Sequence, residues 1–204
     1  ELKDRGMDLG LYRIKNALNI MGQPCSSTPA IHIVGTNGKG SIASFIQSSL
    51  IDSGISVGTT TSPHLINWRE RISINGENIS DKEFIQILKK IILKTNHLEL
   101  TTFELVILTA LKFFEDHDAK IIILETGLGG RLDATTAHPS RPIVAIGGIG
   151  LDHCEHLGNN LEEITKEKAE VISPGSVVIS AKQHPQATKV IEERVARKNA
   201  KLKW

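Results

Sequence analysis

The sequence predicts an α/β protein with a doubly wound, mostly parallel sheet, and three observations support this fold class. Short apolar runs alternate along the chain with segments whose apolar residues recur at helical spacing. The runs 120–125 and 142–146 are apolar almost throughout, as is typical of strands buried on both faces of a parallel sheet. No internal repeat or low-complexity tract interrupts the alternation. Such a sequence favours right-handed crossovers that place helices on both faces of one sheet.

The alternation begins with a helix expected over 9–21, which Gly22 ends. The run 30–34 is expected to form the first strand, a second helix follows from about Ile42, and 56–60 is a second short strand. The chain therefore opens with a helix and then a strand–helix–strand unit.

The middle of the chain starts irregularly over 61–69, becomes extended over 70–74 and turns at the Asn-Gly pair 75–76. Two helices follow, each announced by a hydroxyl residue three positions before a glutamate, which is the capping-box pattern. The two pairs are Ser80 with Glu83 and Thr101 with Glu104.

The rest of the chain continues the alternation up to its last residues. The expected elements are strands at 120–125, 142–146 and 176–179, and helices at 161–172 and 185–199.

Length, charge and cysteine content limit the classes of function. With 204 residues the chain is most simply one domain with a sizeable core. Its formal net charge is +1, so neither a nucleic acid nor a membrane is expected as the main partner. Two distant cysteines, Cys25 and Cys154, fit a reducing compartment. Since no signal peptide or bilayer-spanning run is seen, we expect a cytoplasmic protein, and without an amphipathic surface stripe we expect a monomer.

A glycine-rich segment between the first strand and the second helix predicts a P-loop-type nucleotide site. A strand, a glycine turn and a helix start together aim backbone N–H groups at a phosphate chain. Lys39 would reach the outer phosphates, and the Ser41 hydroxyl would lie beside Mg²⁺. The spacing differs from the common P-loop, because the lysine precedes the last glycine, and a glycine turn with an exposed lysine is the simpler alternative. The segment comprises Gly35, Thr36, Asn37, Gly38, Lys39, Gly40 and Ser41.

Three polar residues follow other predicted strands and are expected near this loop. In open α/β sheets, ligands bind beyond the carboxyl ends of the strands, where Ser62, Glu125 and His153 fall. A hydroxyl, a carboxylate and an imidazole would form a plausible Mg²⁺ shell, although imidazole is a softer ligand than Mg²⁺ usually takes. Each also has a structural alternative: Ser62 would organise a turn, Glu125 would be a solvated strand end, and His153 would cap the next helix.

Two other segments have weaker signals. The glycines in 126–133 are typical of a flexible active-site loop rather than of a dinucleotide fingerprint, which would need a third glycine and a following helix. The two histidines in 153–156 raise the question of zinc, but they lack further ligands at suitable spacing.

Taken together, these motifs resemble the folylpolyglutamate synthase/dihydrofolate synthase branch of the Mur ligase superfamily along essentially the whole chain. The resemblance implies a fold like the Mur ligase central domain and an ATP-dependent amide ligase. It also implies that ATP phosphorylates a carboxylate of dihydropteroate or folate, and that the amine of L-glutamate then attacks the acyl phosphate. The segments that carry the resemblance are 10–13, 35–41, 62–65, 70–72, 101–104, 124–135, 151–153 and 167–169.

The resemblance also implies roles for individual residues. It assigns the segment Gly38 to Ser41 to the ATP phosphates, and Ser62, Glu125 and His153 to Mg²⁺. Lys168 matches a lysine that the family carries as a carbamate, although an ordinary helix lysine is the alternative; with Lys39, Glu125 and His153 it makes up the predicted catalytic set. The general base for the amine is either His153 or a group outside this segment. The pteroate group would contact Gly10, Leu11, Tyr12, Arg13, Thr101, Thr102, Phe103, Glu104, Leu132, Asp133 and Ala134.

The family pattern further implies that residues 1–204 are an incomplete N-terminal ATP-binding domain. A smaller C-terminal domain, which would contribute to the adenine, ribose and glutamate sites, is then expected to lie outside this chain, and the fragment alone is expected to be nearly inactive. Two alternatives remain at this stage: another Mur-type amino-acid ligase of cell-wall synthesis, and a nucleotide kinase or nucleotide-binding switch. The segments 62–65 and 101–104 argue against the cell-wall ligase, and a kinase or switch leaves Glu125, His153 and Lys168 without a shared reason.

Overall fold

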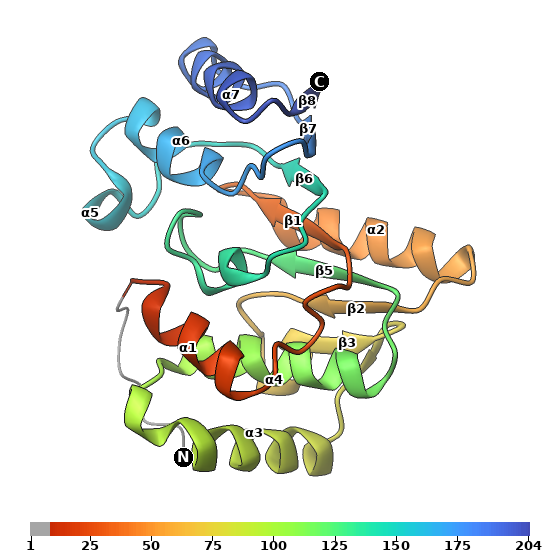
Figure 1. The fold of residues 1–204 in the computed structure, drawn as a ribbon. Helices are drawn as coiled ribbons and strands as arrows, with labels where there is room; N and C mark the ends of the chain where they lie inside the picture. The colour runs from red at the N-terminus through yellow and green to blue at the C-terminus, as the bar shows by residue number, and fades with distance from the viewer. Residues whose placement is uncertain (1–8) are drawn as a thin grey trace.

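A computed structural model describes residues 9–204, so that residues 1–8 of the predicted domain lie outside the described part. One eight-stranded sheet organises the molecule, with the strand order β4-β3-β2-β5-β1-β6-β7-β8 (Figure 1). The strands from β2 to β8 in this order pair in parallel, and only β3 and β4 are antiparallel. The strands are β1 (Ala30–Val34), β2 (Val57–Thr60), β3 (Ile72–Ile74), β4 (Glu77–Asn78), β5 (Ile121–Glu125), β6 (Ile143–Ile146), β7 (Val177–Ser180) and β8 (Lys201–Lys203).

Helices cover both faces of the sheet, which confirms the predicted doubly wound α/β fold. Figure 1 shows α2 on one face and α1, α3 and α4 on the other, with α6 and α7 beside the β6–β8 end. The α-helices are α1 (Tyr12–Ile20), α2 (Lys39–Asp52), α3 (Asp81–Thr95), α4 (Thr102–Asp116), α5 (Cys154–Leu157), α6 (Leu161–Ala169) and α7 (Pro185–Arg197). Three 3₁₀ turns complete the fold: η1 (Trp68–Arg71), η2 (Asn96–Leu98) and η3 (Ala134–Ala137).

The core forms three apolar clusters that follow from this layering. The largest lies between the sheet and helices α1, α3 and α4 and includes Phe114 and Leu108. A second lies under α2, and a third joins β6 and β7 to α6 and α7. The central strand β1 is buried along its whole length, as a near-continuous apolar run predicts. Within residues 9–204, no helix has both the length and the apolar character that crossing a bilayer requires.

Several element boundaries differ from the predicted ones for local reasons. Helix α2 begins at Lys39 rather than near Ile42, because Gly38 takes a left-handed conformation (φ +80°) that starts the helix directly after the turn. Helix α6 ends at Ala169, and the next two apolar residues turn into the core instead of continuing it. The antiparallel β3–β4 hairpin turns at the predicted Asn-Gly pair, where both residues have positive φ.

Candidate functional site

The phosphate-loop candidate lies between the end of β1 and the start of α2. Gly38 is the N-cap of α2, and no side chain caps this helix end. In the described part of the chain, no hydrogen bond occupies the backbone N–H groups of residues 38–41. A helix start with free N–H groups carries partial positive charge, so this end of α2 is suited to bind an anion.

A second glycine-rich segment, which follows β6, holds the loop in place. The Thr36 amide donates to the Gly148 carbonyl at 2.8 Å, and the Thr36 hydroxyl donates to the Gly150 carbonyl at 3.1 Å. Gly147 allows this approach, because a Cβ there would lie 2.8 Å from the Asn37 carbonyl oxygen. Sequence reasoning gave Gly147 no role. The signal that could have predicted this role is the glycine run after a buried strand, which is typical of a close backbone contact.

Two predicted strand-end residues lie beside the start of α2. Glu125 is 3% exposed, and its Oε2 accepts a hydrogen bond from the Ser62 amide at 3.2 Å. Burial raises the pKa of this carboxyl group, while the Ser62 hydrogen bond and the Lys39 charge act in the opposite direction. Lys39 reaches back to the Thr36 carbonyl at 3.4 Å. Glu125 is therefore buried, and the interpretation as a solvated strand end is wrong.

His153 is the third predicted strand-end residue and is more open to solvent. Its side chain is 44% exposed and lies 3.7 Å from a carboxylate oxygen of Asp152. It occupies the N-cap position of α5 but makes no capping hydrogen bond, so the structure does not support a capping role. Across residues 9–204, no group of three or more His, Cys, Asp or Glu side chains is placed to hold a metal.

A cavity of about 570 Å³ opens beside the phosphate loop and brings Lys39, Ser62 and His153 together with most of the predicted pteroate contacts. Trp68 and Arg71 also line it, although sequence reasoning did not place them there; the Arg71 guanidinium lies 4.5 Å from the centre of the Trp68 ring. The predicted contacts that line the cavity are Gly10, Thr101, Thr102, Phe103, Glu104, Leu132, Asp133 and Ala134.

Three residues of the predicted pteroate set do not line this cavity. Leu11 packs against the core, and the Tyr12 side chain is exposed. Arg13 acts indirectly, because its Nε donates to Oε2 of Glu104 at 3.2 Å. Gly10 thus forms part of the cavity wall, and the rest of segment 10–13 supports the wall through the contact of Arg13 with Glu104.

Glu104 lies in the cavity wall with one oxygen satisfied and one not. Its Oε2 accepts hydrogen bonds from the Thr101 amide at 2.7 Å and from the Thr101 hydroxyl at 2.9 Å, as the capping box predicts. Its Oε1 is buried and has no hydrogen-bond partner among residues 9–204. A buried carboxylate oxygen without a donor is costly, so this atom is suited to accept an N–H from a bound molecule.

Asp133, in contrast, is fully engaged by its own loop. One oxygen accepts from the amides of Gly127 and Leu128 at 2.8 and 3.0 Å, and the other accepts from the amide and hydroxyl of Thr135. Burial raises the pKa of this carboxyl group, and these hydrogen bonds oppose the rise. The carboxylate therefore organises the segment 127–135, which forms one wall of the cavity.

Lys168 lies beneath the phosphate loop and not on a solvated helix face. It is 4% exposed, and its Nζ donates to the Gly35 carbonyl at 3.1 Å. Burial, together with the nearby charge of Lys39, lowers the pKa of this amine to about 8. The next acidic residue, Glu170, is paired with Arg194 of α7 at 2.5 Å, so its charge is already compensated.

No family model matches this chain. The chain is 40% identical over 200 residues to the dihydrofolate synthase/folylpolyglutamate synthase of Bacillus subtilis, a match covering 94% of this chain and 46% of that protein. Among solved structures, E. coli FolC in complex with DHPP and ADP superposes with a TM-score of 0.92 at 31% identity, covering 99% of this chain and 48% of that chain. An FPGS-AMPPCP-folate complex superposes with a TM-score of 0.91 at 29% identity, covering 98% and 51%. The chain spans about half the length of the curated relatives it matches.

Proposed function

Because this chain is related to the dihydrofolate synthase/folylpolyglutamate synthase family along nearly its whole length, we propose that it is the ATP-binding domain of an ATP-dependent ligase. The ligase joins L-glutamate to dihydropteroate, to a folate, or to both. One observation carries the proposal: the phosphate loop, through Lys39, opens into the same cavity as the segment 101–104. A nucleotide and an acceptor bound there would meet at the carboxyl ends of the strands.

The nucleotide half of the site rests on the free start of α2. The N–H groups of residues 38–41 and the Lys39 ammonium belong to the same helix start and would neutralise the triphosphate. Similarity to structures that contain ADP and AMPPCP supports the assignment to ATP.

Magnesium fits the oxygen donors beside this loop. Glu125 offers a buried carboxylate that accepts a hydrogen bond from the Ser62 amide, and Ser62 also carries a hydroxyl group. Hard oxygen ligands of this kind suit Mg²⁺, with His153 as a softer third candidate. When bound, Mg²⁺ supplies positive charge that offsets the charge on the phosphates. The protein residues hold and orient the two substrates.

The acceptor half of the site combines an apolar wall with one unsatisfied acceptor atom. Phe103, Leu128 and Leu132 supply apolar surface, and Oε1 of Glu104 can accept a hydrogen bond from a bound molecule. A pteridine ring with N–H groups at one edge meets both requirements. The similarity to complexes that contain DHPP and folate supports this choice of ligand.

The proposed reaction has two steps. A carboxylate oxygen of the acceptor attacks the γ-phosphorus in line, the bond to the β–γ bridging oxygen breaks, and ADP leaves. The glutamate nitrogen then attacks the acyl carbon, phosphate leaves, and the amine loses a proton to His153 or to a group outside this chain. No protein nucleophile is needed, because holding the two substrates in line supplies most of the effect.

A lowered pKa of the Lys168 amine favours carbamate formation. Carbamate formation needs a neutral amine, and a pKa of about 8 leaves an appreciable neutral fraction at physiological pH. The resulting anion beside Gly35 would bring an oxygen donor to the phosphate loop. We propose this modification of Lys168 as part of the function. We also propose that a C-terminal domain completes the glutamate and adenine sites, and that the protein is a cytoplasmic monomer.

Glutamate-dependent ADP release from the complete polypeptide tests the proposed function. The expected result is release only when dihydropteroate or tetrahydrofolate is present together with L-glutamate. Running the two acceptors separately distinguishes a dihydrofolate synthase from a polyglutamate-extending enzyme. ADP release that ignores both acceptors would instead favour a kinase or a nucleotide-binding switch, and a cell-wall amino-acid acceptor would identify a different Mur-type ligase.

A further inference from the structure

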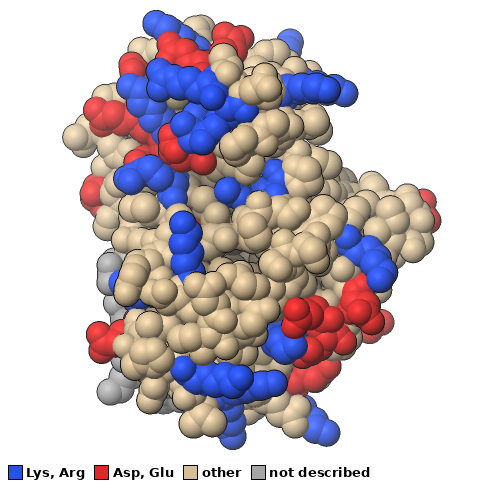
Figure 2. All heavy atoms as spheres, viewed as in Figure 1, with Lys and Arg blue, Asp and Glu red and all other residues tan. Residues whose placement is uncertain are grey.

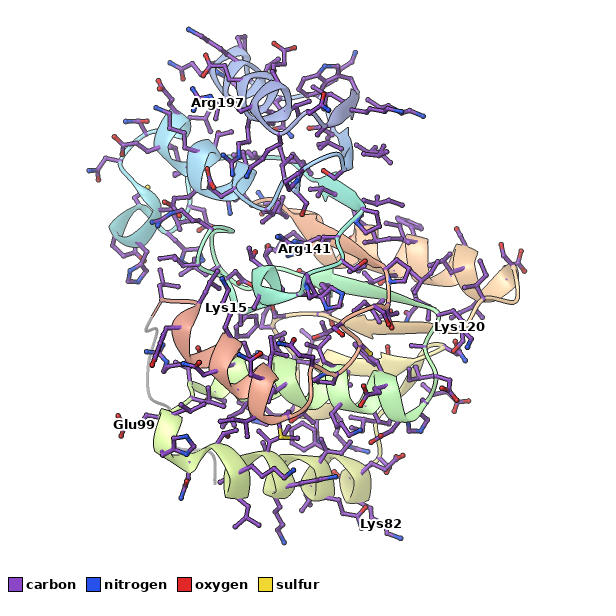
Figure 3. All side chains as sticks on the ribbon, in the orientation of Figure 1. Lys15, Lys82, Glu99, Lys120, Arg141 and Arg197 are labelled. Atoms are coloured by element: carbon purple, nitrogen blue, oxygen red, sulfur yellow. The ribbon has the colours of Figure 1, made fainter. Side chains whose placement is uncertain are left out.

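Four polar side chains form a connected chain through the interior of the molecule. It starts at Arg141, two residues before β6, and ends at Asp133 in the cavity wall. Arg141 Nη1 lies 3.4 Å from His32 Nδ1, His32 Nε2 lies 2.8 Å from the Thr135 hydroxyl, and that hydroxyl lies 2.5 Å from Asp133 Oδ1. His32, Thr135 and Asp133 are each at most 3% exposed. Figure 3 shows Arg141 near the centre of the molecule, whereas Lys82 and Arg197 extend from its opposite ends.

The chemistry of these groups fixes the direction of every hydrogen bond. A guanidinium group can only donate, so His32 Nδ1 must accept. The neutral ring then carries its hydrogen on Nε2 and donates it to Thr135. The threonine hydroxyl has one hydrogen, which it donates to the carboxylate of Asp133. Burial, reinforced by the charge of Arg141, keeps the pKa of His32 well below its usual value, which agrees with a neutral ring.

This directed hydrogen-bond chain connects the buried carboxylate of Asp133 to a positive charge. Across residues 9–204, Asp133 has no ion-pair partner within 4 Å, yet it holds the amides of Gly127 and Leu128. The positive end of the chain at Arg141 is anchored a second time, because Nη1 also donates to the Val171 carbonyl at 3.1 Å. A polarised hydrogen-bond chain between a cation and an anion strengthens each of its members.

We propose that His32 and Arg141 are positioning residues, which act through Thr135 and Asp133 to fix the wall of the ligand cavity at residues 127–128. The strand β1 thereby contributes twice to the site: the phosphate loop follows its end, and its buried middle positions the cavity wall at residues 127–128. The effect on ligand affinity rests on the proposed function, whereas the effect on the wall itself does not.

Amide hydrogen exchange at Gly127 and Leu128, measured by NMR, tests the proposal. Thr135→Val removes the hydroxyl but keeps the shape, and His32→Leu removes the ring nitrogens. Each is expected to speed exchange at both amides about tenfold, the effect of losing roughly one buried hydrogen bond. The double variant is expected to match the single variants, because all three break the same chain.

Matched variants separate this effect from a general loss of stability. Thr109→Val removes another buried hydroxyl, which donates to the Leu105 carbonyl of its own helix, and should leave both amides unchanged. Thr135→Ser should restore wild-type exchange because it keeps the hydroxyl. The Ile122 amide, which donates to the Pro29 carbonyl at 3.0 Å, serves as the internal reference. Equal acceleration at Ile122 and at the two wall amides would overturn the proposal.

Two further readouts complete the test. In the wild-type protein, ¹⁵N shifts of the His32 ring should identify a neutral imidazole with its hydrogen on Nε2; hydrogen on Nδ1 would overturn the proposal without any variant. Folic acid affinity should fall at least fivefold in Thr135→Val and recover in Thr135→Ser. If wild-type protein fails to bind folic acid, that result counts against the proposed function, and the amide exchange still decides whether the chain positions the wall.

Discussion

At the scale of single residues, the buried amine of Lys168, which lies near the charge of Lys39, explains an expected pH dependence. Lys168 lies under Gly35, and the charge of Lys39 adds to the burial that lowers its pKa to about 8. In the unfolded chain this amine has its ordinary pKa of 10.5. Between these values the unfolded state binds more protons than the folded state, so the free energy of unfolding rises with pH in this window.

We therefore predict that Lys168→Met removes a rise in the free energy of unfolding between pH 8 and 10.5. The rise is expected to reach about 3 kcal/mol at most, since one unit of pKa corresponds to roughly 1.4 kcal/mol. Urea titrations at each pH, in buffers purged of CO₂, measure it. Cys25 has the opposite effect on the free energy of unfolding, because burial raises its pKa from 9.0 to about 11. This contribution is the same in wild type and in Lys168→Met, so it cancels when the two curves are subtracted. Parallel curves for wild type and variant would refute the assignment.

Glu104 gives a second prediction at the residue scale. Glu104→Gln replaces the carboxylate, including its unpaired Oε1, with a neutral amide. Folic acid binding is therefore expected to weaken about tenfold or more. Quenching of Trp68 fluorescence, a residue of the cavity wall, reports the binding. Glu83→Gln is the matched control, since Glu83 forms the same capping box on α3 but does not line the cavity. Equal losses in both variants would indicate a helix-capping effect only.

At the scale of elements, the packing of β2 on α4 leaves no room for a side chain at Gly58. A Cβ there would lie 2.5 Å from the ring of Phe114, which is fully buried. Gly58→Ala is thus expected to destabilise the protein by about 1–3 kcal/mol through overpacking. Chemical denaturation measures the loss, and Gly150→Ala, which points into open space, should be neutral in the same assay. Recovery in the double variant Gly58→Ala/Phe114→Leu would confirm the steric cause, and an unchanged Gly58→Ala protein would exclude it.

The elements that could be predicted from sequence are those with a strong periodic or capping signal. The buried strands β1, β5 and β6 and both capping boxes lie where the apolar runs and the Ser/Thr–Glu spacing indicate. The one-turn helix α5 and the edge strand β8 were not predicted, because their short segments have no period of their own. Their conformation depends on contacts with distant parts of the chain, which no local pattern encodes.

At the scale of the whole molecule, the sequence predicts where the site lies but not the buried contacts that hold it in place. The rule that ligands bind at strand ends brought Ser62, Glu125 and the phosphate loop together. It could not show that Lys168 is buried under Gly35, or that His32 connects β1 to the cavity wall. Both contacts join residues more than 100 positions apart in sequence, so they depend on how the sheet is assembled.

The overall charge gives no general attraction for phosphates. The net charge is only +1, and on the face shown in Figure 2 acidic and basic side chains are interspersed instead of forming one broad basic surface. Affinity for a nucleotide must therefore come from the start of α2 with Lys39. A local site of this kind should lose most of its affinity when one central charge is removed.

Isothermal calorimetry with Mg²⁺-ATP is the most direct test of this central claim. Wild-type protein should bind with measurable heat, and Lys39→Ala should lose that heat. Lys82→Ala should bind like wild type, because Lys82 is an exposed lysine of α3, far from the phosphate loop (Figure 3). Equal binding by wild type and Lys39→Ala would contradict the account, since the nucleotide would then bind elsewhere on the molecule.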